Sequence, residues 1–188
     1  MDNKIRKKNM ERKFLPVSIA LLTVSDTRVL ENDKSGNLLA NKIKQSGHIL
    51  FDRKIVKDEI LDIQNVSKKW IKNFDVEVII STGGTGLTGR DVSPEAFREI
   101  FDKEIEGFGE LFRFLSFKKI GTSTIQSRAL AGVSNGTYIF ILPGSPSACK
   151  DAWDEILVHQ LDYRHKPCNF VEIMPRLLEK GIGRTGKS

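Results

Sequence analysis

Residues 17–25 read VSIALLTVS, a nearly continuous apolar run that ends at a serine and is followed by a polar turn. A strand covered on both faces of a parallel sheet has this pattern, whereas a half-exposed strand alternates apolar and polar residues. The run therefore predicts an inner strand of a buried sheet. Outward from it, three further apolar segments predict strands at residues 48–56, 76–80 and 138–142.

Segments with helical periodicity separate these predicted strands. Residues 60–73 are the clearest case, because Ile60, Ile63, Val66 and Trp70 fall on one helical stripe. Regular alternation of strands and helices favours a parallel sheet with right-handed crossovers. The other predicted helices cover residues 36–46, 94–103, about 108–115 and 147–161.

A turn signal late in the chain adds one exception to the parallel arrangement. Asn135-Gly136 lies between SRALAGVS (residues 127–134) and TYIFIL (residues 137–142). Asn-Gly between apolar runs favours a two-residue hairpin, so one strand is expected to run antiparallel to its neighbours. The predicted fold class is α/β, with three layers: a mostly parallel sheet, helices on both faces and one antiparallel hairpin strand.

The positive charge of the chain is concentrated at its two ends. The 188 residues carry a net charge of +6, of which residues 1–13 contribute +4 and residues 176–188 contribute +3. Residues 14–175 therefore carry a net charge of −1. We predict one domain over residues 14–170, preceded by a basic N-terminal tail and followed by a basic C-terminal tail over residues 171–188. A nearly neutral domain disfavours nucleic-acid binding by a folded basic face.

Composition also excludes several classes of protein. No run approaches the roughly 20 apolar residues that a membrane-spanning helix needs, so no membrane association is expected. The N-terminus lacks the apolar segment of a secretory signal. Cys149 and Cys168 are too few to form a disulfide framework. The sequence predicts a reduced, cytoplasmic protein.

The segment after the strand at residues 76–80 has the strongest functional signal. It reads STGGTGLTGRDVSPEA over residues 81–96 and leads into a predicted helix. Glycine lets backbone amides approach an anion closely, and a helix N-terminus adds positive potential. The loop therefore predicts a phosphate-binding site. The structural alternative is a glycine-rich turn in which Arg90 and Asp91 only cap and pair.

Two familiar phosphate-binding patterns overlap this loop, and neither fits fully. Residues 84–89 satisfy G-x-G-x-x-G, but they follow the third strand, and no acidic residue ends a strand about 20 residues later. Gly84 and Gly89 have the Walker A spacing, but Arg90 and Asp91 stand where lysine and serine or threonine are required. Asp91 can instead hold a hydrated Mg²⁺, a hard cation that accepts carboxylate oxygen.

Polar residues also follow two of the other predicted strands. Asp58 follows the strand at residues 48–56 and would form a two-carboxylate metal site with Asp91, or it interacts with the dipole of the next helix. Ser25 and Asp26 end the first strand, where such residues either contact a ligand or form a turn. The carboxyl ends of strands are where open α/β sheets bind ligands.

A second strand-to-helix connection, LPGSPS over residues 142–147, offers hydroxyl groups and free amides. Ser145 and Ser147 could bind another anionic group at the start of the last helix. A rigid turn explains the two prolines equally well.

Several segments, in their order and spacing, resemble one family of proteins. They are TVSD (residues 23–26), TGGTG (82–86) followed by RDVSPEA (90–96), EGFGELFR (106–113), IGTSTIQSRALAG (120–132) and LPGSPSACKDAW (142–153). Together they resemble the MoaB/Mog family of molybdenum cofactor biosynthesis proteins over about residues 14–170.

The resemblance implies a molybdopterin-binding α/β domain that assembles as a homotrimer or homohexamer. In the better understood branch of the family, the terminal phosphate of molybdopterin attacks the α-phosphorus of Mg-ATP, and pyrophosphate leaves. Two aspartates of that branch align by motif with Asp58 and Asp91, which implies catalytic and Mg²⁺-binding roles for both. The other implied ligand-binding residues are Ser25, Asp26, Gly83, Gly84, Thr85, Gly86, Arg90, Ser145 and Ser147.

The predicted function is therefore molybdopterin adenylylation, with molybdopterin and a nucleotide as binding partners and Mg²⁺ as cofactor. The adenylylating branch often carries extra sequence after the LPG turn, and this chain does not. The alternative is a molybdopterin-binding or carrier protein without turnover. A third hypothesis is association with nucleic acid through the basic tails.

Overall fold

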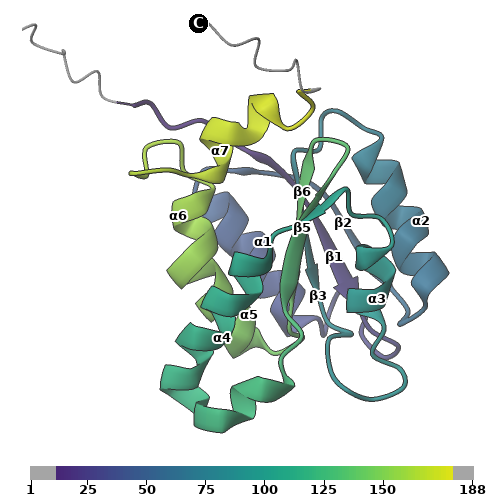
Figure 1. Ribbon diagram of the computed structural model, residues 1–188. Coiled ribbons are helices and arrows are strands. Elements are labelled where there is room, and N and C mark those ends of the chain that lie inside the picture. The colour runs from purple at the N-terminus through teal and green to yellow at the C-terminus, as the bar shows by residue number, and fades with distance from the viewer. Residues whose placement is uncertain (1–11, 180–188) are drawn as a thin grey trace, which may run out of the picture.

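A six-stranded sheet forms the centre of the molecule (Figure 1). The computed structural model describes residues 12–179. The strand order is β2-β1-β3-β6-β5-β4, in which β2, β1, β3 and β6 are parallel and β5 is antiparallel to both of its neighbours. The strands are β1 (Ser18–Val24), β2 (Ile49–Val56), β3 (Val78–Thr82), β4 (Lys103–Glu104), β5 (Leu130–Ser134) and β6 (Thr137–Leu142).

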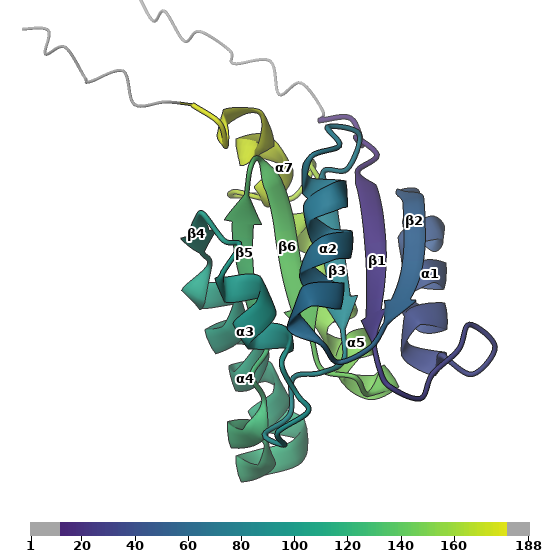
Figure 2. The ribbon, with the colours of Figure 1, turned by 90° about the vertical axis from the view of Figure 1, so that its right-hand side faces the viewer.

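Helices cover both faces of the sheet, which gives the three predicted layers (Figures 1 and 2). One face carries α1 (Lys34–Gln45), α4 (Glu106–Ile120) and α5 (Pro146–Ala152), and the other carries α2 (Ile60–Ile71) and α3 (Ser93–Arg98). The shorter elements are the 3-10 helix η1 (Gly121–Gln126), the π-helical segment η2 (Trp153–Leu157), α6 (Val158–Gln160), α7 (Phe170–Ile173) and the 3-10 helix η3 (Met174–Arg176). The predicted fold class is confirmed.

Strand β1 contributes to two hydrophobic cores, one on each face of the sheet. Ile19 and Leu21 belong to the core that includes residues of α1, α4 and α5. Ala20 and Leu22 belong to the core that includes residues of α2 and α3. All four side chains are fully buried. Because both faces of the strand are covered, both sets of alternating positions are apolar.

The predicted hairpin joins β5 to β6. Asn135 and Gly136 have φ values of 45° and 82°, as a two-residue turn with two left-handed positions requires. Asn tolerates this conformation better than most residues because its short polar side chain bonds locally. The Asn135-Gly136 prediction is confirmed.

Several predicted elements have different bounds in the structure, and two of these differences bear on the sheet and the site. The helix expected over residues 94–103 ends at Arg98, because the chain then joins the edge of the sheet: the amides of Asp102 and Ile105 donate to β5 carbonyls. Strand β3 begins two residues later than expected and continues to Thr82, so that the glycine loop starts directly at its end.

The compact part of the chain extends past residue 170. Val171 of α7 is buried in the core beneath β6, and the hydroxyl of Tyr138 donates to the carbonyl of Phe170 at 3.3 Å. Most of the expected tails, residues 1–11 and 180–188, lie outside the described residues.

Across residues 12–179, none of the helices combines the length and the apolar character needed to cross a membrane.

Candidate functional site

Four strand ends bring the predicted site residues to one edge of the sheet, at the lower end of the view in Figure 2. Because β1, β2, β3 and β6 are parallel, their carboxyl ends lie at the same edge. Ser25 and Asp26 follow β1, Asp58 follows β2, the glycine loop follows β3 and Ser145 follows β6. This is the edge at which open α/β sheets bind ligands.

Asp58 and Asp91 border the same glycine turn. Gly84 has φ +62°, and a Cβ added there would lie 2.5 Å from Oδ1 of Asp58, so both conformation and space require glycine. A Cβ added to Gly86 would lie 2.7 Å from Oδ2 of Asp91. The structure therefore brings together the two carboxylates that the sequence predicted for one site.

Some backbone amides of the glycine turn have a hydrogen-bond acceptor within the protein, and others do not. The Gly83 amide donates to the carbonyl of Leu142 at 3.1 Å, which ties the turn to the end of β6. The Gly86 amide bonds Asp91 and helps to hold its carboxylate ionised. Among the described residues, no acceptor is bonded to the amides of Gly84 and Thr85. Of the four predicted phosphate-binding amides, these two are therefore free to bind an anion.

The carboxylate of Asp91 is held in place by its own loop. Its Oδ2 accepts hydrogen bonds from the hydroxyl and the amide of Thr88, at 2.5 Å and 3.0 Å. Partial burial tends to raise the pKa of Asp91, but these bonds, the Gly86 amide and the charge of Arg128 together hold its pKa below the ordinary value. Asp91 is therefore negatively charged at neutral pH.

The pKa of Asp58 is shifted in the opposite direction to that of Asp91. Burial raises the pKa of the Asp58 carboxyl, and the negative charges of Asp26 and Asp91 raise it further. Its amide donates to Oδ1 of Asp26 at 3.2 Å, so the turns after β1 and β2 are joined. Three carboxylates therefore share one region in which added positive charge would be stabilising.

Arg90 closes one side of the loop rather than projecting freely. Its guanidinium makes a two-pronged contact with Asp26, at 3.1 Å and 3.0 Å, and a third bond to Glu59 at 2.8 Å. The Arg90 bonds hold the pKa of Asp26 below its ordinary value. The residue predicted to contact a ligand thus ties the glycine loop to the turns after β1 and β2.

The predicted serines form local structure around the site. The hydroxyl of Ser25 accepts from the amides of Thr27 and Arg28, both at 3.3 Å, and so forms a turn. Ser145 is the N-cap of α5, and Ser147 lies in the first turn of that helix with its hydroxyl 3.5 Å from that of Ser145. Both serines are exposed, and Ser145 lies close to Thr85 and Gly86 of the glycine turn.

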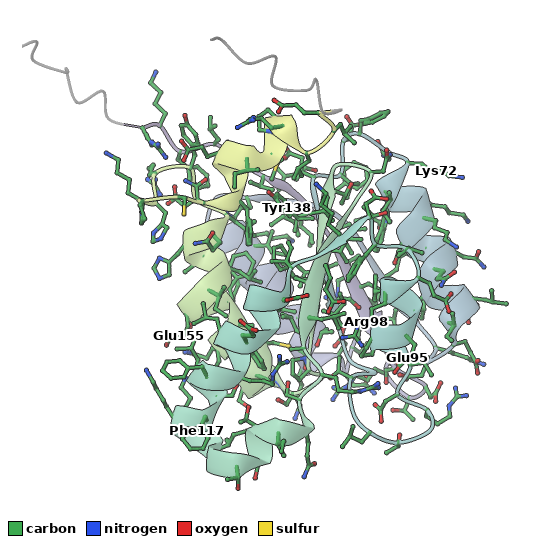
Figure 3. All side chains as sticks on the ribbon, in the orientation of Figure 1. Lys72, Glu95, Arg98, Phe117, Tyr138 and Glu155 are labelled. Carbon is green, nitrogen blue, oxygen red and sulfur yellow. The ribbon has the colours of Figure 1, made fainter. Side chains whose placement is uncertain are left out.

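Arg128 is a site residue that the sequence did not single out. Its guanidinium donates to the carbonyls of Thr85 at 3.3 Å and Asp91 at 2.7 Å, and it also pairs with Glu95. Figure 3 shows Glu95 at the end of the molecule that carries the glycine loop. Arg128 therefore fastens both ends of the loop. The residue lies within the IGTSTIQSRALAG segment, but no local pattern indicates its partners.

Ser93 is a second such residue. Its hydroxyl donates to the carbonyl of Gly83 at 2.8 Å, and its amide donates to the carbonyl of Gly84 at 2.9 Å. The side chain is fully buried. It links the start of α3 to the glycine turn and fixes the turn in the conformation that leaves the Gly84 and Thr85 amides free.

A cavity of about 330 Å³ opens beside the glycine turn. The turn and the start of α5 form one wall, and α4 with η1 forms the other. Pockets of this size are typical for small ligands, particularly when apolar walls carry a few polar groups. Its lining includes Thr85, Gly86, Phe112, Ser116, Ile120, Ser123, Thr124, Ser127, Gly144 and Ser145.

Within residues 12–179, no group of three or more His, Cys, Asp or Glu side chains is arranged to hold a metal ion. A protein cage of the zinc or calcium type is therefore absent from this part of the chain. Magnesium commonly uses only one or two carboxylates, together with water and substrate phosphates. The Asp58 and Asp91 pair matches that smaller requirement.

Glycine amides, a fixed loop and paired carboxylates at a sheet edge define an α/β domain with a candidate site for an anionic, phosphate-bearing small molecule. The sequence profile of the family described as "Probable molybdopterin binding domain" matches residues 20–163. The chain belongs to this family, and the resemblance to MoaB/Mog proteins of molybdenum cofactor biosynthesis is confirmed.

Individual relatives agree with this assignment. The chain is 52% identical over 157 residues to molybdenum cofactor biosynthesis protein B of Escherichia coli (strain K12), covering 84% of this chain and 92% of the relative. A crystal structure of a molybdenum cofactor biosynthesis protein B has a TM-score of 0.77 at 40% identity, over 80% of this chain and 94% of that chain. The tungsten cofactor synthesizing protein MoaB from Pyrococcus furiosus has a TM-score of 0.69 at 34% identity, over 76% and 91%.

Proposed function

We propose that this chain binds molybdopterin and adenylylates it with Mg-ATP, releasing pyrophosphate. One observation carries the proposal: the carboxylates of Asp58 and Asp91 flank a glycine turn in which the amides of Gly84 and Thr85 are free. Free amides bind phosphate, and paired carboxylates bind the metal that accompanies a triphosphate. The family membership and the named relatives support molybdopterin as the second substrate.

The cavity beside the turn suits the pterin. Phe112 and Ile120 provide apolar surface for a flat ring, while several hydroxyl groups provide partners for its polar edge. Thr85 and Gly86 belong to both the cavity and the phosphate-binding turn. A pterin in the cavity would therefore have its terminal phosphate beside the free amides, next to Asp91. The hydroxyl groups are those of Ser116, Ser123, Thr124, Ser127 and Ser145.

The carboxylates fit a magnesium ion. Their oxygens are hard ligands. Burial and, after it, the charges of Asp26 and Asp91 raise the pKa of Asp58, and a cation would relieve the repulsion between the carboxylates. Asp58 and Asp91 would hold the ion, which when bound supplies positive charge against the triphosphate. The Thr88 bonds keep Asp91 ionised and oriented for this role.

The proposed reaction needs no covalent enzyme intermediate. An oxygen of the pterin phosphate forms a bond to the α-phosphorus of ATP, and the bond from that phosphorus to the β-phosphate oxygen breaks. The products are adenylylated molybdopterin and pyrophosphate. The protein positions two anions in line and stabilises the charge on the leaving group, which is the main source of catalysis in phosphoryl-type transfers.

The test is to mix the purified protein with molybdopterin and Mg-ATP and to detect adenylylated pterin by mass spectrometry. We expect product with the unmodified chain, and a loss of product but retained pterin binding with Asp91→Ala and Asp58→Asn. Pterin binding without any product would support the non-catalytic carrier instead. Undiminished product from both variants would leave an adenylyltransferase but reject this site.

Assembly as a homotrimer or homohexamer stays a prediction. An apolar strip on α4 supports it, since Leu111, Phe114 and Phe117 are 44%, 59% and 55% exposed. Phe117 lies at the outer surface of the helix in Figure 3. Exposed aromatic residues are common at protein interfaces. Sedimentation velocity measures the state directly, and Phe117→Ser should weaken the assembly.

A further inference from the structure

A second cavity, of about 540 Å³, lies on the other side of the turn after β1. The end of β1, the end of β2 and the β1–α1 loop form its walls. Asp26 belongs to this cavity and also accepts the bond from the Asp58 amide, so the cavity adjoins the proposed catalytic carboxylates. The proposed reaction has so far assigned it no ligand.

Two of the three basic residues that line this cavity form no ion pair within the described part of the chain. Arg28, Arg53 and Lys57 line it. Within residues 12–179, neither Arg28 nor Lys57 forms an ion pair, and the Arg28 guanidinium donates only to the carbonyl of Asn32, at 3.1 Å. Its acidic lining residues are Glu31 and Asp26, and Asp26 is paired with Arg90. Of the lining residues without an ion pair in the described part of the chain, Arg28 and Lys57 are positive and Glu31 is negative, so the balance beside the site is positive.

The guanidinium of Arg53 lies in the wall of the same cavity and is held in place by two hydrogen bonds. Its two terminal nitrogens donate to Asp33 at 2.8 Å and Asn37 at 2.7 Å, and Asp33 is fully buried. The remaining guanidinium nitrogen, Nε, is buried and has no partner among the described residues. A buried donor without an acceptor is costly, and Arg53, which carries this donor, forms part of the wall beside Arg28 and Lys57.

A third cavity on the opposite flank of Asp58 has the opposite charge. It measures about 410 Å³, and Asp58, Glu59 and Asp62 line it, with Arg90 already paired. A polyphosphate is repelled from such a lining, whereas the uncharged base and sugar of a nucleotide are not. The two cavities around Asp58 therefore differ in which end of a nucleoside triphosphate they can accept.

We infer that the cavity of Arg28, Arg53 and Lys57 binds the β- and γ-phosphates of the nucleotide, the group that leaves as pyrophosphate. The inference rests on the proposed function, in which the α-phosphate is attacked beside Asp58 and Asp91. From that point the two terminal phosphates extend past Asp26 onto the cations. The cations stabilise the negative charge that develops on the leaving oxygen as its bond to the α-phosphorus breaks.

Arg28 and Lys57 are the residues to change. Arg53→Ala would break the ion pair with the buried Asp33 and destabilise the fold, whereas Arg28 and Lys57 make no ion pair within the described residues. The test variant is Arg28→Gln/Lys57→Gln. The matched control is Lys69→Gln/Lys72→Gln, which removes the same charge from the exposed end of α2. Lys72 lies at the opposite end of the molecule from Glu95 in Figure 3.

The experiment measures binding of Mg-pyrophosphate, Mg-ATP, AMP and molybdopterin by isothermal titration calorimetry, with the full chain. We expect the test variant to raise the dissociation constants for pyrophosphate and ATP by about tenfold or more, as loss of two charge-assisted contacts implies. AMP and molybdopterin affinities should change by less than about twofold, as should all four in the control.

Two outcomes separate this inference from the proposed function. Unchanged pyrophosphate affinity in the test variant, or an equal loss for AMP and ATP, would overturn the phosphate assignment even if adenylylated pterin still forms. Conversely, pyrophosphate binding that depends on Arg28 and Lys57 in a chain that forms no adenylylated pterin would support the anion site and reject the reaction.

Discussion

Replacing Arg128 with alanine should loosen the glycine loop at both ends. The guanidinium donates to the Asp91 carbonyl at 2.7 Å and to the Thr85 carbonyl at 3.3 Å, and its side chain is 24% exposed. Hydrogen bonds from a charged donor contribute about 1.5–3 kcal/mol each, but the freed carbonyls of this surface loop can bond water. We therefore expect a net loss of about 2 kcal/mol, concentrated in the loop.

A loss of this size is measurable in two ways. For a domain of this length it lowers the melting temperature by roughly 4–8 °C. Molybdopterin affinity should fall as well, because the amides of Gly84 and Thr85 are no longer held in one arrangement. Removing the positive charge of Arg128 also raises the pKa of Asp91, which that charge helps to depress.

The control variants separate the effect of the two hydrogen bonds from the Arg128 guanidinium from the effect of its positive charge. Arg128→Lys keeps the charge but cannot reach both carbonyls, so it should not restore pterin affinity. Glu95→Gln removes only the exposed ion pair and should have little effect. Arg164→Ala removes an exposed arginine that is paired with Asp162, and it too should leave the loop unchanged. If Arg128→Ala melts and binds pterin as Arg164→Ala does, the role assigned to Arg128 is wrong.

Three other changes test the physical basis of the fold and the site. Asp33→Ala should cost about 3–5 kcal/mol in urea unfolding, because it leaves the Arg53 guanidinium without its buried partner; a cost equal to that of an exposed carboxylate would contradict this. Gly84→Ala should cost roughly 1–3 kcal/mol and reduce pterin binding, because the positive φ and the nearby Asp58 carboxylate both oppose a side chain; an unchanged crystal structure and affinity would refute it. Burial lowers the pKa of His48 below 6.5, against the opposing charge of Asp162, so His48 binds its proton more tightly in the unfolded chain. The contribution of His48 to stability should therefore be constant above about pH 7 and decline as the pH falls through 6.5. Unfolding midpoints at pH 5 and 7.5 check this, and His48→Asn, which retains a hydrogen-bond acceptor, should weaken the dependence.

Much of the architecture follows from local sequence patterns. The run at residues 17–25 predicted a strand covered on both faces, and Ile19 to Leu22 are fully buried between two helical layers. The Asn135-Gly136 pair predicted the hairpin, because only certain residues adopt two successive left-handed conformations. Parallel strands end at one edge, so the positions of Asp58 and Asp91 after two strands also predicted that they would meet.

Other features depended on partners that lie far away in the sequence. The helix at residues 94–103 ends early because Asp102 and Ile105 bond strand β5, and the helical pattern contains no signal of that competition. Arg90 was predicted to contact a ligand, and the fold also pairs it with Asp26 and Glu59, two partners that no local pattern indicates.

The sequence by itself determined the order of strands and helices, the apolar faces that form the two cores, and the glycine turn between two acidic residues. Those properties are local, since periodicity, turn preference and side-chain volume act over a few neighbouring residues. Only the tertiary structure decided which amides of the turn stay free and that Arg128 and Ser93 hold it. It also decided that cations gather on one side of Asp58 and carboxylates on the other. These outcomes depend on hydrogen bonds and charges from segments that come together only when the sheet forms, and no single stretch of the chain encodes them.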